Sequence, residues 1–377
     1  MHFTCTKEHL DRALRYSAKA LAKHSTLPIV QNVVFTAHDG VLECAATNLD
    51  VGVRIQMSGK IEEEGSVVVP PHLLASFIAS VDGGAQIAVT RTSDAGIAVE
   101  SGSSRATIKG FDPADFPPIP QREDTGNKIV VRSDVFRNIV SRVAVSVAKT
   151  EARPELTGVN MVFEDGVVCV AATDGFRLSE GRVAVEEMSC DKELSAIIVP
   201  ASAIAEVLYI LSDSGAKTMA MYVDEGQVFC EIDGVTIVSR LIAGTYPDYQ
   251  QIIPQSTVAD IVVARSECER VLRLADAFAN NTTSDMQLAV DVEAGTCTIR
   301  AVSQDRGENV TTMDVVAHGE PQEIFLNTRY VLDGVSRCGS DQVRIAFSGP
   351  ASPVVITPVM DGDDQGDFLY LVMPIRK

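Results

Sequence analysis

The chain lacks any arrangement of cysteines that would indicate a disulfide framework or a zinc site. Its eight cysteines are dispersed, and none belongs to a Cys-x-x-Cys pair. The six histidines do not gather near them, whereas a structural zinc site needs its ligands close together. Several cysteines, such as Cys169, lie within apolar runs. We therefore expect buried, reduced thiols and no bound metal.

Signatures of catalysis are also missing. The sequence has no glycine-rich phosphate loop, no Gly-x-Ser-x-Gly and no His-Glu-x-x-His. Asp174 could be imagined as a nucleophile or a metal ligand, but no second carboxylate or histidine cluster accompanies it. The pair Asp174-Gly175 is more typical of a turn. An enzyme remains one alternative, yet we predict no catalytic residue and no cofactor.

Long apolar segments and a secretion signal are absent as well. Residues Met1–Cys5 do not show a basic stretch followed by an apolar one. The longest apolar stretch, 195–211, contains Pro200 and Glu206, which is typical of a strand followed by a helix rather than of a membrane span. We expect a cytoplasmic protein that has no membrane contact.

What the sequence does contain is a threefold internal repeat. Residues 67–70 (VVVP) return as 197–200 (IIVP) and as 324–327 (IFLN), at separations of 130 and 127. Residues 47–50 (TNLD) return as 173–176 (TDGF) and more weakly as 303–306 (SQDR). Three copies of one unit predict three domains, at 1–124, 125–255 and 256–377, and favour a symmetric scaffold over a single catalytic cleft.

Each repeat has the same order of expected elements. Apolar spacing predicts a first helix at 9–22, 133–148 and 266–280, and a second at 71–81, 201–212 and 328–338. Short strands fill the rest, among them 29–37, 41–46 with Asp39-Gly40 as a hairpin turn, and 368–375. Two helices and roughly eight strands per repeat indicate an α+β fold.

Basic residues concentrate on the first helices although the chain as a whole is acidic. The formal net charge is −19, from 32 basic and 51 acidic residues, so the chain should repel nucleic acid on average. For one helix a solvated basic face would be the ordinary interpretation. Because the equivalent helix is basic in all three repeats, a positive lining that contacts phosphates without reading sequence becomes the better hypothesis.

The repeat and several motifs together resemble one family, the bacterial sliding clamp, which is the β subunit of the DNA polymerase III holoenzyme. The resemblance covers the whole chain. It is carried by the order and spacing of the segments 3–10, 26–29, 115–117, 172–178 (ATDGFRL), 246–249 (YPDY) and 370–376 (YLVMPIR). Any one of these segments is a weak signal, whereas the set is specific.

This resemblance implies a head-to-tail homodimer of three repeated clamp domains per chain, closed into a ring with inner helices and outer sheets. Such a ring encircles double-stranded DNA and tethers the polymerase by topology, without sequence specificity. Polymerase subunits, the clamp loader and repair proteins would dock through short peptide motifs rich in Gln, Leu and Phe. Their pocket would lie between the second and third domains.

Site residues follow from the resemblance position by position. The peptide pocket would comprise Leu156, Thr173, Gly175, Phe176, Arg177, Leu178, Pro247, Ile252, Asn327, Tyr330, Val354, Val372, Met373, Pro374, Ile375 and Arg376. The DNA-facing set would comprise Arg12, Arg15, Lys19, Lys23, His24, Arg137, Arg142, Lys149, Arg153, Arg270 and Arg273. The dimer seam would comprise Arg105, Ile108, Phe278, Asp305 and Glu308, with an apolar contact between Ile108 and Phe278.

Four positions depart from the family pattern. Phe176 stands where histidine is usual, Gln251 where a basic residue is common, and Lys377 where an apolar residue is frequent. His24 replaces a basic loop residue, so its DNA contact should be weak near neutral pH. These departures predict a more apolar and less basic pocket rim, and they concern the choice of peptide rather than the existence of the pocket.

A second alternative is a scaffold that binds peptides through the same pocket but never encircles DNA. Such a scaffold would have no need for the basic residues Arg137, Arg142 and Arg273 on its helices. Charge reversal of these helices therefore separates the two hypotheses, because it should abolish retention on DNA and spare peptide binding.

Overall fold

The computed structural model of the chain describes residues 1–22, 27–122, 127–164, 166–190, 194–224, 226–280, 283–360 and 368–375. The chain forms two compact units. Unit 1 comprises Met1–Arg137, Val185–Leu194 and Ser202–Leu241, and unit 2 comprises Asn138–Ala184, Ser195–Ala201 and Ile242–Lys377. The central third of the sequence thus contributes to both units. The domain boundaries near residues 124 and 255 stay a prediction.

Unit 1 contains two antiparallel sheets. The first is five-stranded, in the order β5 (Lys60–Glu63), β1 (His2–Thr6), β7 (Gln86–Arg91), β8 (Ile97–Ser101) and β9 (Ser104–Ile108). The second begins with β6 (Gly65–Val69), β2 (Val33–His38), β3 (Val41–Thr47) and β4 (Val51–Met57). It continues from β4 into β17 (Val235–Arg240), β16 (Gln227–Ile232), β15 (Thr218–Asp224), β10 (Asn127–Arg132) and the end of β13 (Arg177–Ser189).

Unit 2 has the same plan. One sheet begins with β14 (Ala196–Pro200), β11 (Gly158–Glu164), β12 (Val167–Thr173) and the start of β13. It continues into β26 (Phe368–Val372), β25 (Val354–Pro358), β24 (Gln342–Phe347), β18 (Ala259–Ala264) and β22 (Val316–Gly319). The other sheet is four-stranded, in the order β21 (Gly307–Asp314), β20 (Thr296–Ser303), β19 (Asp285–Asp291) and β23 (Gln322–Asn327).

Helices cover these sheets. They are α1 (Lys7–Ser17), α2 (Pro71–Ala79), α3 (Ser133–Val143), α4 (Ala201–Ser214), α5 (Arg265–Phe278) and α6 (Thr328–Arg337). Helix α1 packs on α2, β3 and β4, and α5 packs on α6, β20 and β21. The apolar residues of α1 and α5 face these sheets and are buried, so burial of one helical face is what fixes each helix in place.

Helix starts agree with sequence signals, and several ends do not. Helix α1 begins after Thr6, whose hydroxyl accepts from the N–H of His9, and α2 begins at Pro71 as predicted. Helix α1 ends at Ser17 rather than residue 22, and beyond it the N–H of Ala20 donates to the carbonyl of Ser17 and the N–H of Ala22 to the carbonyl of Val30. Helix α3 likewise ends at Val143 and tightens into a 3₁₀ turn, Ala144–Ser146.

The strand predicted at 29–37 begins later than expected. Residues Pro28–Gln31 form a 3₁₀ turn, because the side-chain amide of Asn32 donates to the carbonyls of Pro28 and Ile29 and closes it. The other 3₁₀ turns are Pro113–Asp115, Pro154–Thr157 and Gln250–Ile252. The Asp39-Gly40 hairpin turn is confirmed, with φ of 49° and 76°, as two consecutive left-handed residues require.

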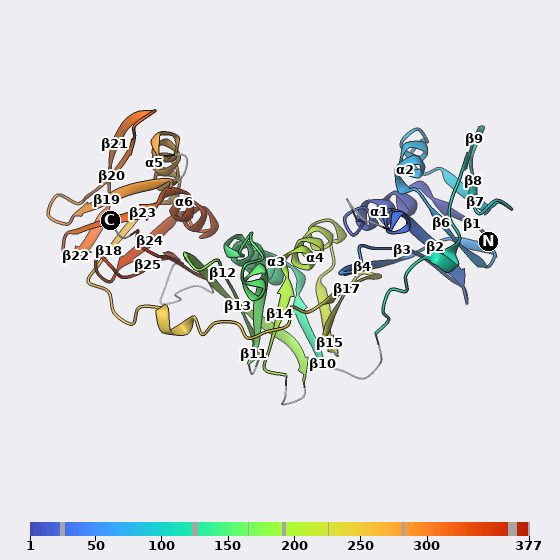
Figure 1. The fold of residues 1–377 in the computed structure, drawn as a ribbon, viewed down its shortest axis with the longest axis horizontal. Helices are drawn as coiled ribbons and strands as arrows, with labels where there is room; N and C mark the ends of the chain where they lie inside the picture. Colours follow the sequence, from blue (N-terminus) through green and yellow to red (C-terminus); the bar gives the residue numbers. More distant parts are fainter. Residues whose placement is uncertain are drawn as a thin grey trace. The chain divides into compact units, whose positions relative to one another are not determined.

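The larger sheet of each unit, here called its junction sheet, joins strands of two repeats in the same way. In unit 1 the four strands β6-β2-β3-β4 are followed in space by five strands that start with β17. In unit 2 the four strands β14-β11-β12-β13 are followed by five strands that start with β26. The four-stranded and five-stranded sheets that remain end at β21 and β9. Figure 1 shows both strands at the border of their sheets. Within the described residues, neither edge has a partner on its outer side.

Candidate peptide pocket and DNA-facing surface

Residues predicted for the pocket come together in unit 2 where β13 meets β26. Arg177 pairs with Val372 and Leu178 with Leu371 in an antiparallel register. The N–H of Met373 donates to the carbonyl of Phe176 over 2.8 Å, and Val354 pairs with Val372 from the other side. Strand pairing is therefore what brings two segments nearly 200 positions apart into one site.

A tight turn before β13 presents the exposed part of this site. The carboxylate Oδ1 of Asp174 accepts from the N–H groups of Phe176 (2.9 Å) and Arg177 (3.1 Å). Gly175 has φ of 89°, which glycine adopts without strain. The hydroxyl of Thr173 donates to the carbonyl of Arg177. Asp174 thus shapes a turn, which confirms the structural interpretation of Asp174-Gly175.

Arg177 is a buried cation inside the site, with only 5% of its surface exposed. Its Nε lies 3.0 Å from Asp174 Oδ2 and its Nη1 2.5 Å from Asp333 Oδ2. Although burial by itself lowers the pKa of Arg177, its interactions with Tyr370, Asp333 and Asp174 raise the pKa overall, so the group stays charged. Its guanidinium also lies 4.6 Å from the ring centroid of Tyr330.

Sequence reasoning missed Asp333 and Tyr370. Both hydrogen-bond Arg177. Tyr370 opens the recognised segment 370–376 but was not assigned to the site, and Asp333 stands in no recognised motif. Asp333 is on α6, one turn after Tyr330, so the helical spacing of an acidic residue beside a predicted site residue was the available signal.

The predicted pocket residues divide into a buried floor and an exposed rim. Leu156, Leu178, Val354 and Val372 are buried and form the core beneath the site. Phe176 is 63% exposed and Ile252 is exposed, while the remaining described members are half-buried or polar: Asn327, Tyr330, Pro247, Met373, Pro374 and Ile375. Asn327 also caps α6 by accepting from the N–H groups of Arg329 and Tyr330. Arg376 and Lys377 lie outside the described residues.

An apolar cluster supports the floor from behind. Ala171, Leu178, Tyr249 and Leu371 form its buried part, and Tyr246, Ile253, Leu369 and Met373 pack against it. The hydroxyl of Tyr246 accepts from the N–H of Thr173, which ties the connector 246–253 to the turn. The pocket therefore has a rigid base and a rim in which Phe176 is the most exposed apolar side chain.

Five of the nine predicted DNA-facing cations that the structure describes form ion pairs with acidic neighbours. Arg12 lies 2.8 Å from Asp233, and Arg15 lies 3.1 Å from Asp11 and 3.2 Å from Asp213. Arg153, Arg270 and Arg273 pair with glutamates in the same way. Lys19 sits over the ring of Tyr209, while Arg137 and Lys149 are exposed. Lys23 and His24 lie outside the described residues. The basic faces thus carry less free charge than the sequence suggests.

Arg142, predicted to face DNA, is half-buried and has contacts within unit 2. Its guanidinium donates to the carbonyl of Cys338 at the end of α6 over 3.4 Å and lies 5.9 Å from the ring centroid of Phe368. Burial lowers the pKa of Arg142, and a cation at a helix C-terminus is favoured by the helix dipole. Arg142 therefore joins elements of unit 2, and its contact with DNA stays a prediction.

Ile108, predicted for the seam, is only 4% exposed, because β9 places it in its own sheet opposite Ile97. Its apolar contact with Phe278 of a second chain stays a prediction. Arg105 is exposed and bridges to Glu100, and Glu308 bridges to Arg300. Phe278 is half-buried and Asp305 is exposed. Exposed apolar side chains near these positions are instead Val310, at 55%, and Leu274, at 37%.

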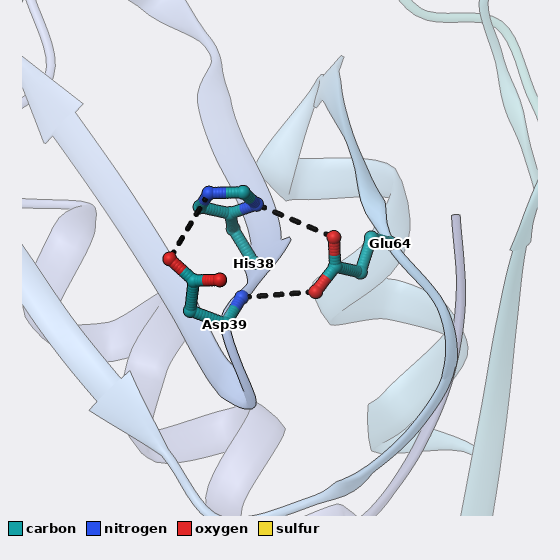
Figure 2. Close-up of side chains that lie close together, drawn as sticks. All are labelled: His38, Asp39 and Glu64. Atoms are coloured by element: carbon teal, nitrogen blue, oxygen red, sulfur yellow. Dashed lines mark hydrogen bonds and ion pairs between the residues drawn. The ribbon is translucent and has the colours of Figure 1, made fainter.

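His38, Asp39 and Glu64 form one group of potential metal ligands in the described part of the chain. Figure 2 shows the imidazole of His38 lying between the two carboxylates. Nε2 faces Asp39 at 3.2 Å, Nδ1 faces Glu64 at 3.3 Å, and the N–H of Asp39 donates to Glu64. All three residues are exposed, and their mutual contacts link the 38–39 turn to Glu64.

No described helix combines the length and the apolar character that crossing a membrane requires. All cysteines are free thiols, and most are buried. Burial raises the pKa of Cys5 and of Cys44 to about 12, so these thiols are not reactive nucleophiles.

Comparison with known proteins matches all three parts of the chain to one family. Residues 1–120 match the N-terminal domain of the DNA polymerase III beta subunit, 130–248 its central domain and 250–376 its C-terminal domain. The beta sliding clamp of Staphylococcus aureus is 26% identical over 389 residues, which cover all of this chain and 99% of that protein.

Solved structures of the same family have a similar fold. The DNA polymerase III beta subunits of Pseudomonas aeruginosa (24% identical, TM-score 0.92) and Thermotoga maritima (25% identical, TM-score 0.89) each align over the full length of both chains. The chain therefore belongs to the DNA polymerase III beta subunit family, the beta sliding clamps, which are non-catalytic processivity factors of DNA replication.

Proposed function

We propose that two copies of this chain close head to tail into a ring that encircles duplex DNA. One observation carries the proposal. Both junction sheets continue four strands of one repeat with five of the next, while a four-stranded sheet ending in β21 and a five-stranded sheet ending in β9 are left over. Pairing of β21 with β9 of a second copy repeats the same junction, and doing so twice closes a ring of six domains, with boundaries at 1–124, 125–255 and 256–377.

The repeat also predicts a register for this seam. Val51 pairs with Ser239 in unit 1, and the equivalent Arg177 pairs with Val372 in unit 2. In the third repeat, the residue equivalent to Val51 is Gly307. In the first repeat, the residue equivalent to Ser239 is Ile108, because the hairpins β8–β9 and β16–β17 have the same register. Ile108 should therefore pair with Gly307 through the backbone, and Arg105 should pair with Val310 of the other copy.

Helix side chains would seal the seam on its other face. Leu274 and Leu73 are exposed, and Phe278 and Phe77 follow one turn after them on α5 and α2. These two pairs form apolar stripes at the i, i+4 spacing of a packing face. Docking of α5 on α2 of the second copy covers both stripes and adds an apolar contact to the seam.

DNA contact then falls to the exposed cations on the first helices and on the segments that directly follow α1 and α3. Arg15, Lys19, Arg137, Lys149, Arg270 and Arg273 are all exposed. Because several of them share their charge with neighbouring carboxylates, they would attract phosphates without holding them tightly. Weak, sequence-independent attraction suits a ring that slides along duplex DNA.

Client proteins would dock at the rim around Phe176. We infer that polymerase subunits, the clamp loader and repair proteins insert short motifs rich in Gln, Leu and Phe between Phe176, Ile252 and Met373. The flexible thioether of Met373 suits several peptide shapes, and Phe176 enlarges the apolar rim. This surface would couple polymerase to the ring and give processive synthesis.

Retention on circular DNA tests the central claim. The protein is loaded onto nicked circular DNA with a cognate loader and followed before and after the circle is cut. Stable retention on the circle and loss after linearisation is the expected result. Retention that cutting does not change, or no retention on circles, would contradict encirclement and would favour the peptide-binding scaffold.

A further inference from the structure

Unit 2 contains a cavity of about 460 Å³ between the connector after Tyr249 and the sheet face that carries no helix. Its walls are the connector residues Ile253, Pro254, Gln255 and Thr257, and side chains of β18, β24, β25 and β26. The sheet residues concerned alternate with the buried residues under α5 and α6, so they belong to the opposite face. None of the rim residues assigned to the peptide pocket lines this cavity.

The equivalent place in unit 1 shows what normally fills this space. The pair Lys128–Tyr222 of unit 1 has its equivalent in the pair Asp260–Ala346 of unit 2. In the same way, the pair Ala220–Glu231 of unit 1 corresponds to the pair Arg344–Thr357 of unit 2. Tyr222 and Phe229 in unit 1 therefore correspond to Ala346 and Val355 in unit 2. Unit 2 has smaller side chains where unit 1 has two aromatic rings, and the cavity lies at that position.

Unit 1 fills the same face by stacking a cation on an aromatic ring. The guanidinium of Arg122, from the connector between the first two repeats, lies 4.2 Å from the ring centroid of Tyr222 and 3.2 Å from Glu231. In unit 2 the connector offers Ile253 and Pro254 instead, and Thr357 stands where Glu231 does. The ring and its polar partner are thus both missing from the chain itself.

The walls of the cavity match a planar ring with one polar edge. Val262, Val355 and Leu369 give an apolar floor, and Pro254 and Pro358 give flat walls. Thr357 and Gln255 offer hydrogen bonds, and Arg344, held 3.2 Å from Asp260, supplies a guanidinium at the border. Aromatic side chains with a polar edge prefer such mixed surroundings.

We propose that this cavity receives an aromatic side chain, tyrosine in the first place, from a partner polypeptide docked on the clamp. The inference rests on the proposed peptide-docking function, because it takes the occupant to be a second contact of the same client. Ile253 and Leu369 line the cavity and pack in one cluster with Leu178 and Met373 of the pocket. The cavity and the pocket therefore share one apolar support, to which the partly buried Ile253, Leu369 and Met373 all belong.

Binding of N-acetyl-tyrosinamide to the full chain tests the proposal by saturation-transfer NMR. We expect a clear signal for the wild type and its loss in Ala346→Tyr, which restores the ring that unit 1 carries. Val355→Phe is a second cavity-filling variant, with Phe229 as its model, in case the first folds poorly. Ala220→Tyr, on the corresponding face of unit 1, is the matched control and should keep the signal.

Three outcomes overturn the proposal. They are no signal for the wild type, an unchanged signal in both folded cavity-filling variants, or equal binding of N-acetyl-leucinamide, which would remove the aromatic preference. Binding of p-cresol without N-acetyl-tyrosinamide would also count against a polypeptide occupant.

A fluorescent Gln-Leu-Phe motif peptide separates this test from the proposed function. We expect the peptide to bind the wild type and Ala346→Tyr with equal affinity, because its pocket is a different surface. If the motif peptide fails to bind while N-acetyl-tyrosinamide binds, the assignment of the pocket fails and the cavity remains an aromatic site. If both fail, both assignments are wrong.

Discussion

Arg177 and Asp333 form an ion pair, 2.5 Å from Nη1 to Oδ2, that joins β13 to α6 inside unit 2. The two residues come from different repeats and are 156 positions apart. The arginine is nearly buried, so its charge depends on this carboxylate and on that of Asp174. Formation of the pocket floor is thereby coupled to the packing of α6.

Removal of this carboxylate should loosen unit 2. In Asp333→Ala the buried guanidinium of Arg177 loses one of its two ion-pair partners, which we expect to cost about 1–3 kcal/mol of stability. The measurement is the unfolding midpoint in urea followed by circular dichroism. Glu293→Ala, at an exposed turn of the same unit, is the control and should shift little. Equal midpoints for both variants would show that Asp174 alone is sufficient for Arg177.

Glu206 gives a prediction for pH dependence. Burial raises the pKa of this α4 carboxyl from 4.5 to about 7, against an opposing effect of Lys19, and its Oε2 has no hydrogen-bond partner among the described residues. The unfolded chain ionises first, so Glu206 weakens the fold progressively as pH rises from about 4.5 through about 7.

We therefore expect Glu206→Gln to raise the melting temperature at pH 8 by about 2 °C, allowing for partial solvent screening, and by much less at pH 5. Differential scanning fluorimetry at both values measures the effect. Glu151→Gln, at an exposed position, should show no such difference between the two pH values. A larger gain at pH 5 than at pH 8 would reverse the sign and refute the assignment.

Local features of the fold could be predicted from the sequence. Buried spacing in α1 and α5, Pro71 at the start of α2 and the Asp39-Gly40 turn are local signals, and the structure confirms them. The ends of α1 and α3 were not predictable, because they depend on hydrogen bonds such as that from Ala22 to Val30, which tertiary packing supplies.

In the candidate sites, too, local hydrogen bonds could be predicted from the sequence and contacts between distant segments could not. The turn 173–177 was recognisable because Thr, Asp and Gly each form it through local hydrogen bonds. The partners of Arg142 were not, because its contacts with Cys338 and Phe368 come from a distant repeat. A basic residue on an amphipathic helix can face solvent or bridge to another helix, and only the packing of the neighbouring element decides which.

Cross-linking can test the seam register directly. If β9 and β21 of two copies pair as the repeat indicates, Arg105→Cys and Val310→Cys in one chain should form a disulfide with the second copy. A dimer band on a non-reducing gel is the readout. Thr107→Cys with Val310→Cys is two residues out of register and should cross-link far less. Equal yields for both pairs would mean that the edges meet in another register or only by collision.

Leu274 allows the helix contact of the seam to be tested separately. Leu274→Arg places a charge in the apolar stripe of α5, and we expect it to shift the protein from dimer to monomer in sedimentation velocity at micromolar concentration. Val316→Arg, at another exposed apolar residue of unit 2, serves as the control. A dimer that survives Leu274→Arg would remove α5 from the interface.

Phe176 should control client binding without affecting the ring. It is exposed and is held by the Asp174 turn, so Phe176→Ala removes an apolar contact without disturbing the backbone hydrogen bonds of the site. We expect about tenfold weaker binding of a Gln-Leu-Phe motif peptide, equivalent to about 1.4 kcal/mol. Retention on nicked circular DNA should stay unchanged. Phe111→Ala, an exposed phenylalanine of unit 1, controls for a general loss of apolar surface. If both variants bind the peptide equally well, the rim does not use Phe176, and peptide recognition must rest on the Ile252 and Met373 side of the pocket.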